Sequence, residues 1–335
     1  MKIKIAINGF GRIGRLVFRS AFNREGIEIV GINDLMPVGT LAHLLKYDSV
    51  YGKFPFKVSS GDSKLCVGDS EVPVFSSRNP ADLPWGEMGV DYVVESTGIF
   101  RTKEAASSHI KAGARRVIIS APGAGEIDGT FVMGVNHQKF DPAKDFIVSN
   151  ASCTTNCLAP IAKVLNDNYG IKEGLMTTIH AYTAGQNLID GPNKDLRRAR
   201  SAALNIVPTT TGAAKAIGVV LPELKGKLNG MSIRVPTPTV SLVDLTVKVA
   251  NLPKDTGEVN SKFEHASKNE LNGVLGYEEI PLVSKDFEGD PRSSILDSAS
   301  TYVMGSLIKV LSWYDNETGY ATRVVDLAEY MAENE

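Results

Sequence analysis

A cysteine with hydroxyl residues on both sides follows a predicted strand at 146–150 and begins a predicted helix. This is Cys153, in the sequence Ser-Asn-Ala-Ser-Cys-Thr-Thr-Asn-Cys. Backbone N–H groups and the dipole at a helix start stabilise a thiolate and lower a cysteine pKa. The hydroxyls of Ser152 and Thr154 can hold a phosphate or a developing oxyanion. The segment therefore indicates covalent chemistry on a phosphorylated electrophile, although a buried and inert cysteine is the alternative.

A cysteine nucleophile needs a base, and histidine commonly supplies it. His180 stands at the end of a predicted strand and is followed by Tyr182 and Thr183, which places it at the rim of a site, where Thr183 is a predicted substrate ligand. The alternative is a strand-end histidine with a structural role only. The remaining histidines lie in polar or helical surroundings and are predicted to be surface residues: His43, His109, His137 and His265.

Cations and a second helix start indicate where a substrate phosphate binds. Arg234 lies between a predicted strand and a Val-Pro turn, where a guanidinium needs a partner, and its planar fork suits phosphate oxygens. Thr211 and Gly212 precede a predicted helix at 213–220, which is another anion-binding helix start. The basic run at 194–200 offers further arginines, but its residue types do not single one out.

The N-terminus carries a glycine motif between a predicted strand at 2–8 and a predicted helix at 12–22. In this G-x-G-x-x-G pattern the first glycine allows a tight turn, the second lets the backbone approach a pyrophosphate, and the third lets helix and strand pack closely. A βαβ unit without a ligand is the alternative. The predicted cofactor-binding residues of this turn are Gly9, Gly11, Arg12, Ile13 and Gly14.

An acidic residue follows the next predicted strand, at 27–32. Asp34 lies about twenty residues beyond the glycines, where a Rossmann unit binds the ribose hydroxyls of a dinucleotide. A carboxylate at this position repels a 2′-phosphate. No arginine follows to bind such a phosphate, since the next residues are Leu35, Met36 and Pro37. The sequence therefore predicts NAD as the cofactor, in preference to NADP.

The order of predicted elements gives the fold class and two domains. In the first half, strands alternate with helices, which indicates a doubly wound parallel sheet of the Rossmann type, with small or polar residues at the strand ends 33–34, 96–98 and 120–123. After Cys153, longer strands without regular crossovers indicate an α+β catalytic domain with a mixed or antiparallel sheet; they are predicted at 175–181, 231–235, 240–249 and 298–313. We expect a NAD-binding domain at 1–150, completed by a C-terminal helix within 316–335, and a catalytic domain at 151–315. Pro160 predicts a kink or a later start for the helix after Cys153.

Composition excludes several classes of protein. A chain of 335 residues fits two domains, and its net charge of −2 provides no basic field for nucleic acid. No apolar stretch has the length of a membrane span. Three cysteines cannot all pair, which favours a reducing, cytoplasmic location, and no His/Cys cluster has metal-ligand spacing, so no metal is expected.

Taken together, these motifs resemble phosphorylating glyceraldehyde-3-phosphate dehydrogenase of the bacterial, glycolytic type. The resemblance covers essentially the whole chain, in order, through the segments 8–15, 149–160, 180–183, 195–200, 208–215, 234–238 and 313–317. It implies oxidation of glyceraldehyde 3-phosphate with NAD and inorganic phosphate, through a thioester on Cys153, to 1,3-bisphosphoglycerate. It also implies that Arg78 and Ser120 contact the cofactor and that Asn316 binds the nicotinamide carboxamide. Arg198 is the phosphate ligand by alignment, with Arg197 as the alternative.

The resemblance further implies a homotetramer. The segment 182–208 is long, basic and without clear periodicity, and the family places such a loop against the neighbouring subunit's cofactor site. Pro192 resembles the residue with which the NAD-specific family closes that pocket. Ala184 and Gly185 depart from many bacterial relatives, in which an acidic residue often follows the His-Ala-Tyr-Thr run. Erythrose-4-phosphate dehydrogenase and a non-catalytic NAD-binding regulator remain as alternative functions.

Overall fold

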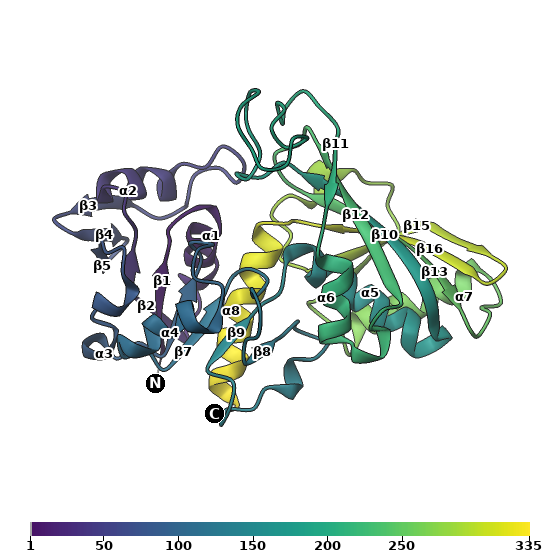
Figure 1. The fold of residues 1–335 in the computed structure, drawn as a ribbon, viewed down its shortest axis with the longest axis horizontal. Helices are drawn as coiled ribbons and strands as arrows, with labels where there is room; N and C mark the ends of the chain where they lie inside the picture. The colour runs from purple at the N-terminus through teal and green to yellow at the C-terminus, as the bar shows by residue number, and fades with distance from the viewer. Residues whose placement is uncertain (1) are drawn as a thin grey trace. The chain divides into compact units, whose positions relative to one another are not determined.

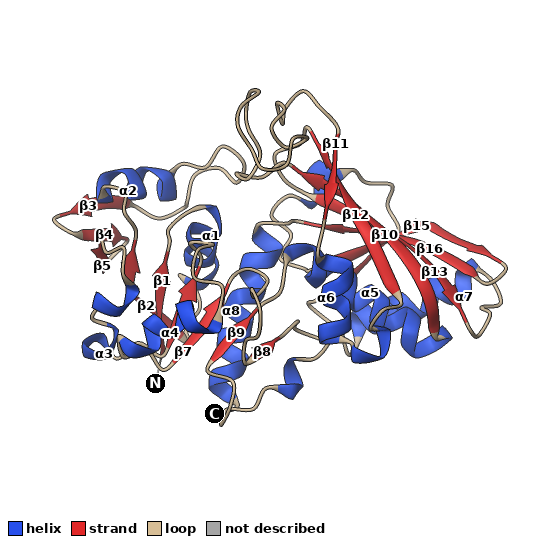
Figure 2. Ribbon diagram, in the orientation of Figure 1, coloured by secondary structure: helices blue, strands red, loops and turns tan. Residues whose placement is uncertain are grey.

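The computed structural model describes residues 2–335, which form two compact units (Figure 1). The first unit contains residues 2–131, His137–Ala151 and Ala321–Glu335. The second contains Val132–Asn136 and Ser152–Tyr320. Each unit has its own large sheet with helices packed against it (Figure 2). The predicted fold class, a Rossmann-type unit plus a unit with a mixed sheet, is confirmed.

The first unit is built on these strands: β1 (Ile3–Asn8), β2 (Ile27–Asn33), β3 (Val58–Gly61), β4 (Lys64–Val67), β5 (Ser70–Phe75), β6 (Tyr92–Glu95), β7 (Arg116–Ile119), β8 (Gly129–Thr130) and β9 (Ile147–Ser149). They lie in the order β3-β4-β5-β2-β1-β6-β7-β9-β8, and β1 pairs in parallel with β2 on one side and with β6 on the other. The direction of winding therefore reverses beside β1, and open α/β sheets bind ligands at the carboxyl ends of strands at such a point.

Short helices connect these strands. They are α1 (Arg12–Ala21), α2 (Val38–Lys46), η1 (Pro80–Asp82), α3 (Trp85–Met88), α4 (Lys103–Lys111) and η2 (His137–Lys139), and α8 (Thr318–Glu333) returns to this unit from Ala321 onward.

The second unit has the strands β10 (Ile171–Ala181), β11 (Val207–Thr210), β12 (Leu228–Val235), β13 (Ser241–Val249), β14 (Leu275–Glu278), β15 (Ser294–Met304) and β16 (Leu307–Tyr314). Their order is β11-β12-β10-β13-β16-β15-β14, with both parallel and antiparallel pairs. The helices of this unit are α5 (Cys153–Tyr169), α6 (Ala213–Val220), η3 (Pro222–Leu224), α7 (Thr256–Lys268) and η4 (Ser284–Phe287). Helix α5 packs against β10, β13, β15 and β16 and places its first residue near the ends of these strands.

Two sequence-based expectations for this unit are wrong. The strand predicted at 298–313 is a hairpin of β15 and β16, because Gly305 adopts φ +60° and reverses the chain. Of the two alternatives predicted from Pro160, the later start is wrong, since α5 begins at Cys153 and continues through Pro160. The long segment that follows β10 has no clear periodicity in the sequence, and residues 182–206 contain no helix or strand.

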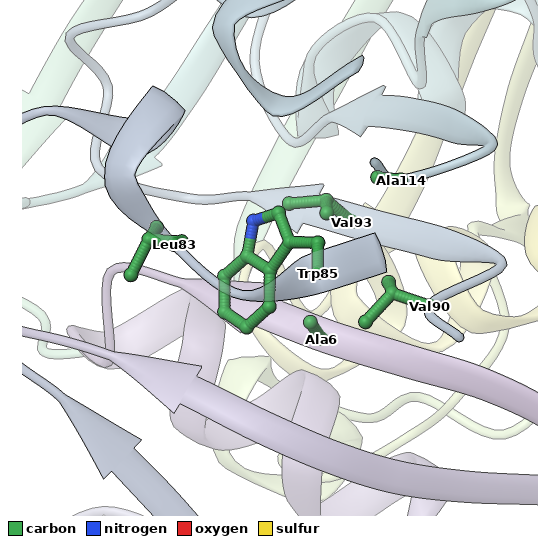
Figure 3. Packing of buried hydrophobic residues seen from close by; sticks show 6 residues of the cluster. All are labelled: Ala6, Leu83, Trp85, Val90, Val93 and Ala114. Atoms are coloured by element: carbon green, nitrogen blue, oxygen red, sulfur yellow. The ribbon is translucent and has the colours of Figure 1, made fainter. Parts of the chain in front are cut away.

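The core of the first unit contains a buried tryptophan. Trp85 is fully buried and packs with Leu83, Val90, Val93, Ala6 and Ala114 (Figure 3). Its indole nitrogen donates a hydrogen bond to His109 Nδ1 at 3.1 Å. His109 is also fully buried, so its prediction as a surface residue is wrong. The polar neighbours of His109 in the sequence gave no sign that α4 turns this residue toward the sheet.

The glycine motif leaves no room for a side chain at its third position. A Cβ at Gly14 would lie 2.1 Å from the Gly9 carbonyl oxygen, whereas a Cβ at Gly26 would meet no atom within 4 Å. We expect Gly14→Ala to lower the free energy of unfolding by about 1–3 kcal/mol, because the backbone must shift to accept the methyl group. Gly26→Ala is the matched control and should have little effect. Urea unfolding of both variants tests this, and equal stability of the two would contradict the close packing.

Candidate active site

Cys153 is positioned by the start of helix α5. Ser152 is the N-cap, and its Oγ accepts a hydrogen bond from the Thr155 N–H at 3.0 Å. The preceding residue, Ala151, has φ +56°, in the left-handed region that residues with a Cβ seldom adopt. The sharp turn brings Cys153 to the first turn of the helix, where backbone N–H groups have no partner within the helix. Strain of this kind often occurs at functional sites.

His180 lies beside Cys153. Its Nε2 is 3.5 Å from Cys153 Sγ, and its Nδ1 is 2.7 Å from the Ala181 carbonyl oxygen. Arg234 reaches the same place, because β10 and β12 pair in parallel with His180 opposite Arg234. Arg234 Nη1 donates to the Ala181 carbonyl oxygen at 2.9 Å and lies 2.8 Å from His180 Nδ1. The structure thus brings together three of the residues predicted from the sequence.

Burial governs the protonation of this group. His180 is 4% exposed, and burial together with the charges of Arg234 and Arg198 lowers its pKa to about 3. The imidazole is therefore neutral at physiological pH. Burial also raises the pKa of Cys153, although the charge of Arg234 and hydrogen bonds from Thr154 act in the opposite direction. The expectation of a lowered thiol pKa is wrong, because loss of solvent outweighs the helix start; the thiol must lose its proton to a neighbouring base.

A buried tyrosine supports the pair, and the sequence reasoning missed it. The Tyr314 hydroxyl bonds to the hydroxyls of Thr154 (2.9 Å) and Thr178 (2.8 Å), and its ring meets the His180 ring edge-on at 6.0 Å. These contacts hold α5 against β10. The available signal was a tyrosine at the very end of a buried strand, where its hydroxyl needs partners.

Asn316 is linked to the same strand end. Its Oδ1 accepts a hydrogen bond from the Ser241 hydroxyl at 2.9 Å, and Ser241 Oγ accepts one from the Ala181 N–H at 3.1 Å. Asn316 is 5% exposed, and its amide is oriented by this bond. Ser241 is a second supporting residue that the sequence did not single out.

The Arg234 guanidinium has capacity for an anion. Its Nε is buried and has no hydrogen-bond partner among the described residues, so a donor remains for a ligand oxygen. Arg198 adds positive charge nearby, since it contributes to the lowered pKa values of both His180 and Arg234. The Arg198 Nε donates to Thr209 Oγ1 at 3.0 Å. Arg197 is exposed and donates instead to the Pro208 carbonyl oxygen.

The remaining predicted substrate ligands differ in accessibility. Thr211 is half-buried and accepts a hydrogen bond from the Ala213 N–H, next to the N-cap Gly212 of α6. Thr183 is exposed. Thr154 is only 4% exposed and its hydroxyl is bound to Tyr314, so its side chain holds the helix rather than facing solvent.

The first unit contains a pocket of about 400 Å³ at the carboxyl ends of β1, β2 and β6. Of the predicted cofactor residues, it is lined by Gly9, Gly11, Asp34 and Arg78. A Cβ at Gly9 would lie 2.7 Å from the Thr97 nitrogen, so only a glycine fits there. Asp34 accepts hydrogen bonds from the N–H groups of Phe10 and Met36, which orient its carboxylate. Glycine cradle and oriented carboxylate together fit NAD.

Other predicted cofactor residues do not line this pocket. Arg12 forms an ion pair with Asp48, and Ser120 donates to the Glu95 carbonyl oxygen. Ile13 and Gly14 belong to the first turn of α1. The pocket is also lined by residues that sequence reasoning did not assign to it: Asn8, Leu35, Ser77, Ile99 and Phe100. Asn8 could have been detected as the polar last residue of β1, and Ser77 as a polar residue soon after the end of β5.

Residues 2–335 contain no further candidate site of two kinds, a membrane span and a metal centre. No helix there has the length and apolar character needed to cross a bilayer. Nor do three or more His, Cys, Asp or Glu side chains gather within that range in a way that could ligate a metal ion.

Comparisons with known proteins cover almost the whole chain. Residues 3–103 match the family model of the glyceraldehyde 3-phosphate dehydrogenase NAD binding domain, and residues 152–316 match that of the C-terminal domain of the same family. Glyceraldehyde-3-phosphate dehydrogenase 1 of Bacillus subtilis is 57% identical over 333 residues, which is 99% of each chain. The Geobacillus stearothermophilus glyceraldehyde-3-phosphate dehydrogenase is 58% identical over 335 residues, again 99% of each chain. A Nostoc glyceraldehyde-3-phosphate dehydrogenase is 56% identical over 337 residues, covering 100% of this chain and 98% of the relative.

The two neighbouring thiols should differ in reactivity. Burial raises the pKa of Cys157 to about 12, whereas Arg234 counteracts the rise at Cys153. We expect iodoacetamide to label Cys153 before Cys157, and Arg234→Leu to move the pH midpoint of labelling upward by about one unit, since a cation that favours the thiolate is lost. Peptide mass spectrometry across a pH series measures both. Equal labelling of the two cysteines, or an unmoved midpoint, would contradict this electrostatic arrangement.

Proposed function

Because this chain belongs to the glyceraldehyde-3-phosphate dehydrogenase family, we propose that it is the phosphorylating, NAD-dependent enzyme of glycolysis and gluconeogenesis. It oxidises glyceraldehyde 3-phosphate to 1,3-bisphosphoglycerate through a thioester on Cys153. The observation that carries this proposal is the 3.5 Å approach of Cys153 Sγ to His180 Nε2, beside an arginine with an unpartnered buried nitrogen.

His180 acts first as a base toward the thiol. When its Nδ1 carries the ring proton and donates to the Ala181 carbonyl oxygen, its Nε2 is free to accept the proton of Cys153. The thiolate then attacks the aldehyde carbon and forms a hemithioacetal. The protonated imidazole returns its proton to the aldehyde oxygen during this attack, so the ring is neutral again. It then takes the proton back from the hemithioacetal hydroxyl as the carbon is oxidised to a thioester. NAD supplies the hydride acceptor when bound.

Inorganic phosphate completes the reaction. A phosphate oxygen attacks the thioester carbon, and the sulfur of Cys153 leaves as a thiolate, so the acyl phosphate forms without hydrolysis. Arg234 and Arg198 provide the cations for the phosphate groups, with Thr211, Gly212, Thr183 and the Ser152 hydroxyl as the further ligands. The Arg234 Nε supports this role, because a buried donor without a partner gains most from a charged acceptor.

The cofactor site supports NAD rather than NADP. Gly9, Gly11, Asp34 and Arg78 line the pocket of the first unit, and the Asp34 carboxylate would accept ribose hydroxyls and repel a 2′-phosphate. Ser120 and Asn316 remain proposed cofactor contacts. Asn316 has an amide already oriented by Ser241, as recognition of a carboxamide requires.

The loop at 182–206 supports assembly as a homotetramer. It exposes large apolar side chains in a single segment that contains no helix or strand: Leu188, Ile189, Leu196, Leu204 and Ile206. Several large exposed apolar side chains in one segment support a role in protein contact. A catalytic thiol must also stay reduced, which is consistent with the proposed cytoplasmic location.

The direct test follows NADH absorbance with glyceraldehyde 3-phosphate and NAD, with and without inorganic phosphate. Continuous turnover should require phosphate, and its omission should limit NADH to about one equivalent per site because the thioester is not released. Phosphate-independent turnover would rule out the phosphorylating reaction. A higher kcat/KM with erythrose 4-phosphate would assign the enzyme to that aldose instead.

Two variants tie the reaction to the proposed residues. Cys153→Ser should abolish turnover, with Cys157→Ser as the matched control that retains it, because Cys157 is buried against Ser294 and the Ser312 carbonyl. His180→Asn should slow turnover by about 10² to 10⁴, the range of general acid–base catalysis. Loss of activity in Cys157→Ser alone would place the nucleophile there.

A further inference from the structure

A buried carboxylate lies beneath the pocket of the first unit. Glu95, the last residue of β6, is 1% exposed. Its Oε1 accepts hydrogen bonds from the N–H of Thr97 (2.8 Å) and from the hydroxyl of the same residue. Its Oε2 accepts from Asn8 Nδ2 and contacts His109 Nε2 at 3.0 Å. None of these partners is a lysine or an arginine, so the charge depends on keeping every one of these donors.

Trp85 decides which way the His109 ring donates. The indole nitrogen is only a donor, and it lies 3.1 Å from His109 Nδ1. His109 Nδ1 must therefore be the acceptor, and the proton of the neutral ring sits on Nε2, facing the carboxylate. While the bond to Trp85 lasts, Nδ1 cannot take a second proton. His109 is thus held as a neutral donor to Glu95.

Further hydrogen bonds connect Glu95 with the residues that line the pocket. Asn8 donates to Glu95, and its Oδ1 accepts from Asn33 Nδ2 at 2.7 Å. Asn33 Oδ1 in turn accepts from the Ser77 N–H at 2.8 Å. Asn8, Asn33, Ser77 and Thr97 all line the pocket, and Ser77 precedes Arg78 there. A set of four pocket residues is consequently oriented from below by these bonds. Asn8 Nδ2 also lies 3.3 Å from His109 Nε2, so the amide and the ring share the Glu95 carboxylate.

Glu95 is the one ionisable group that contacts His109 within the described chain. The charged residues of elements packed on α4 have other partners or face solvent. Asp82 of η1 is exposed and bonds to Asn79. Arg116 of β7 bonds to Glu335 and to two carbonyl oxygens. On α4 itself Lys103, Glu104 and Lys111 are exposed.

We propose that Trp85, His109 and Glu95 are positioning residues of the NAD pocket, in which the indole N–H fixes the His109 tautomer and Glu95 orients Thr97 and Asn8 toward the cofactor. The proposal rests on the cofactor site of the proposed function. None of the three need contact NAD; the tryptophan and the histidine act through the carboxylate. The desolvation cost of the buried Glu95 carboxylate is offset only when all of its hydrogen-bond donors are in place. The residues of the pocket wall are therefore held in one arrangement.

Trp85→Phe tests the tautomer directly, because it keeps an aromatic ring and removes the N–H. His109 Nδ1 then loses its donor and becomes free to accept a proton. An imidazolium competes with Asn8 and Thr97 for the carboxylate and weakens its hold on both. NAD binding by this variant should therefore become weaker as the pH falls, by about tenfold between pH 8 and pH 5.5.

The measurement is the Kd for NAD by titration calorimetry across that pH range. Trp313→Phe is the matched control, since it removes the only other indole N–H of the sequence, which donates to Asp297 in the second unit. The wild type and Trp313→Phe should share one shallow profile. kcat at saturating NAD should stay within about twofold in Trp85→Phe, because the chemistry of the second unit is untouched.

A second variant covers the case in which Trp85→Phe does not fold. His109→Phe removes one donor to Glu95 and brings no charge, so the Kd for NAD should rise by about tenfold at every pH. A Trp85→Phe profile parallel to wild type, or an unchanged Kd in His109→Phe, would overturn the proposal while leaving the proposed function intact. Failure of the wild type to bind NAD would overturn both.

Discussion

The chemistry of this protein depends on the contact between Cys153 Sγ and His180 Nε2, 3.5 Å apart in a largely buried site. The surrounding helix, strands and hydrogen bonds hold these two atoms at that distance. The N-cap Ser152 starts α5 at the cysteine, and the parallel register of β10 with β12 brings an arginine beside the histidine. Tyr314 then ties the helix to β10 through two hydroxyl groups. Burial disfavours each charged form on its own, so the thiolate is stabilised only as an ion pair with the imidazolium, beside the Arg234 charge.

Two buried histidines have opposite roles, and in each case the neighbours of Nδ1 decide. At His180 burial and the charge of Arg234 keep the ring neutral. Its Nδ1 lies near both the Ala181 carbonyl oxygen and Arg234 Nη1, and Nε2 can accept the thiol proton in the tautomer in which Nδ1 donates to the carbonyl. At His109 the Trp85 indole donates to Nδ1, which makes Nε2 a donor to Glu95. The indole therefore fixes His109 as a structural donor, whereas the carbonyl beside His180 allows the tautomer in which Nε2 is a base.

The parts of this structure that could be predicted are those carried by local patterns. The glycine turn, Asp34 after β2, and Cys153 at a helix start follow from spacing, and the resemblance to the dehydrogenase family is confirmed by the family models and the full-length relatives. What could not be predicted depends on contacts distant in sequence. The buried position of His109 results from packing of α4 against the sheet, and the raised pKa of Cys153 results from burial of its thiol. The β15–β16 turn was hidden because Gly305 lies in an otherwise strand-like run.

Mass spectrometry of the enzyme mixed with glyceraldehyde 3-phosphate and NAD, in the absence of inorganic phosphate, tests the central claim most directly. The covalent route requires a phosphoglyceroyl group on the peptide that contains Cys153, and this group must disappear when phosphate is added. The adduct should form in Cys157→Ser and be lost in Cys153→Ser. Full NADH formation with no adduct on any cysteine, or an adduct on Cys157 alone, would contradict a thioester at the Cys153–His180 pair.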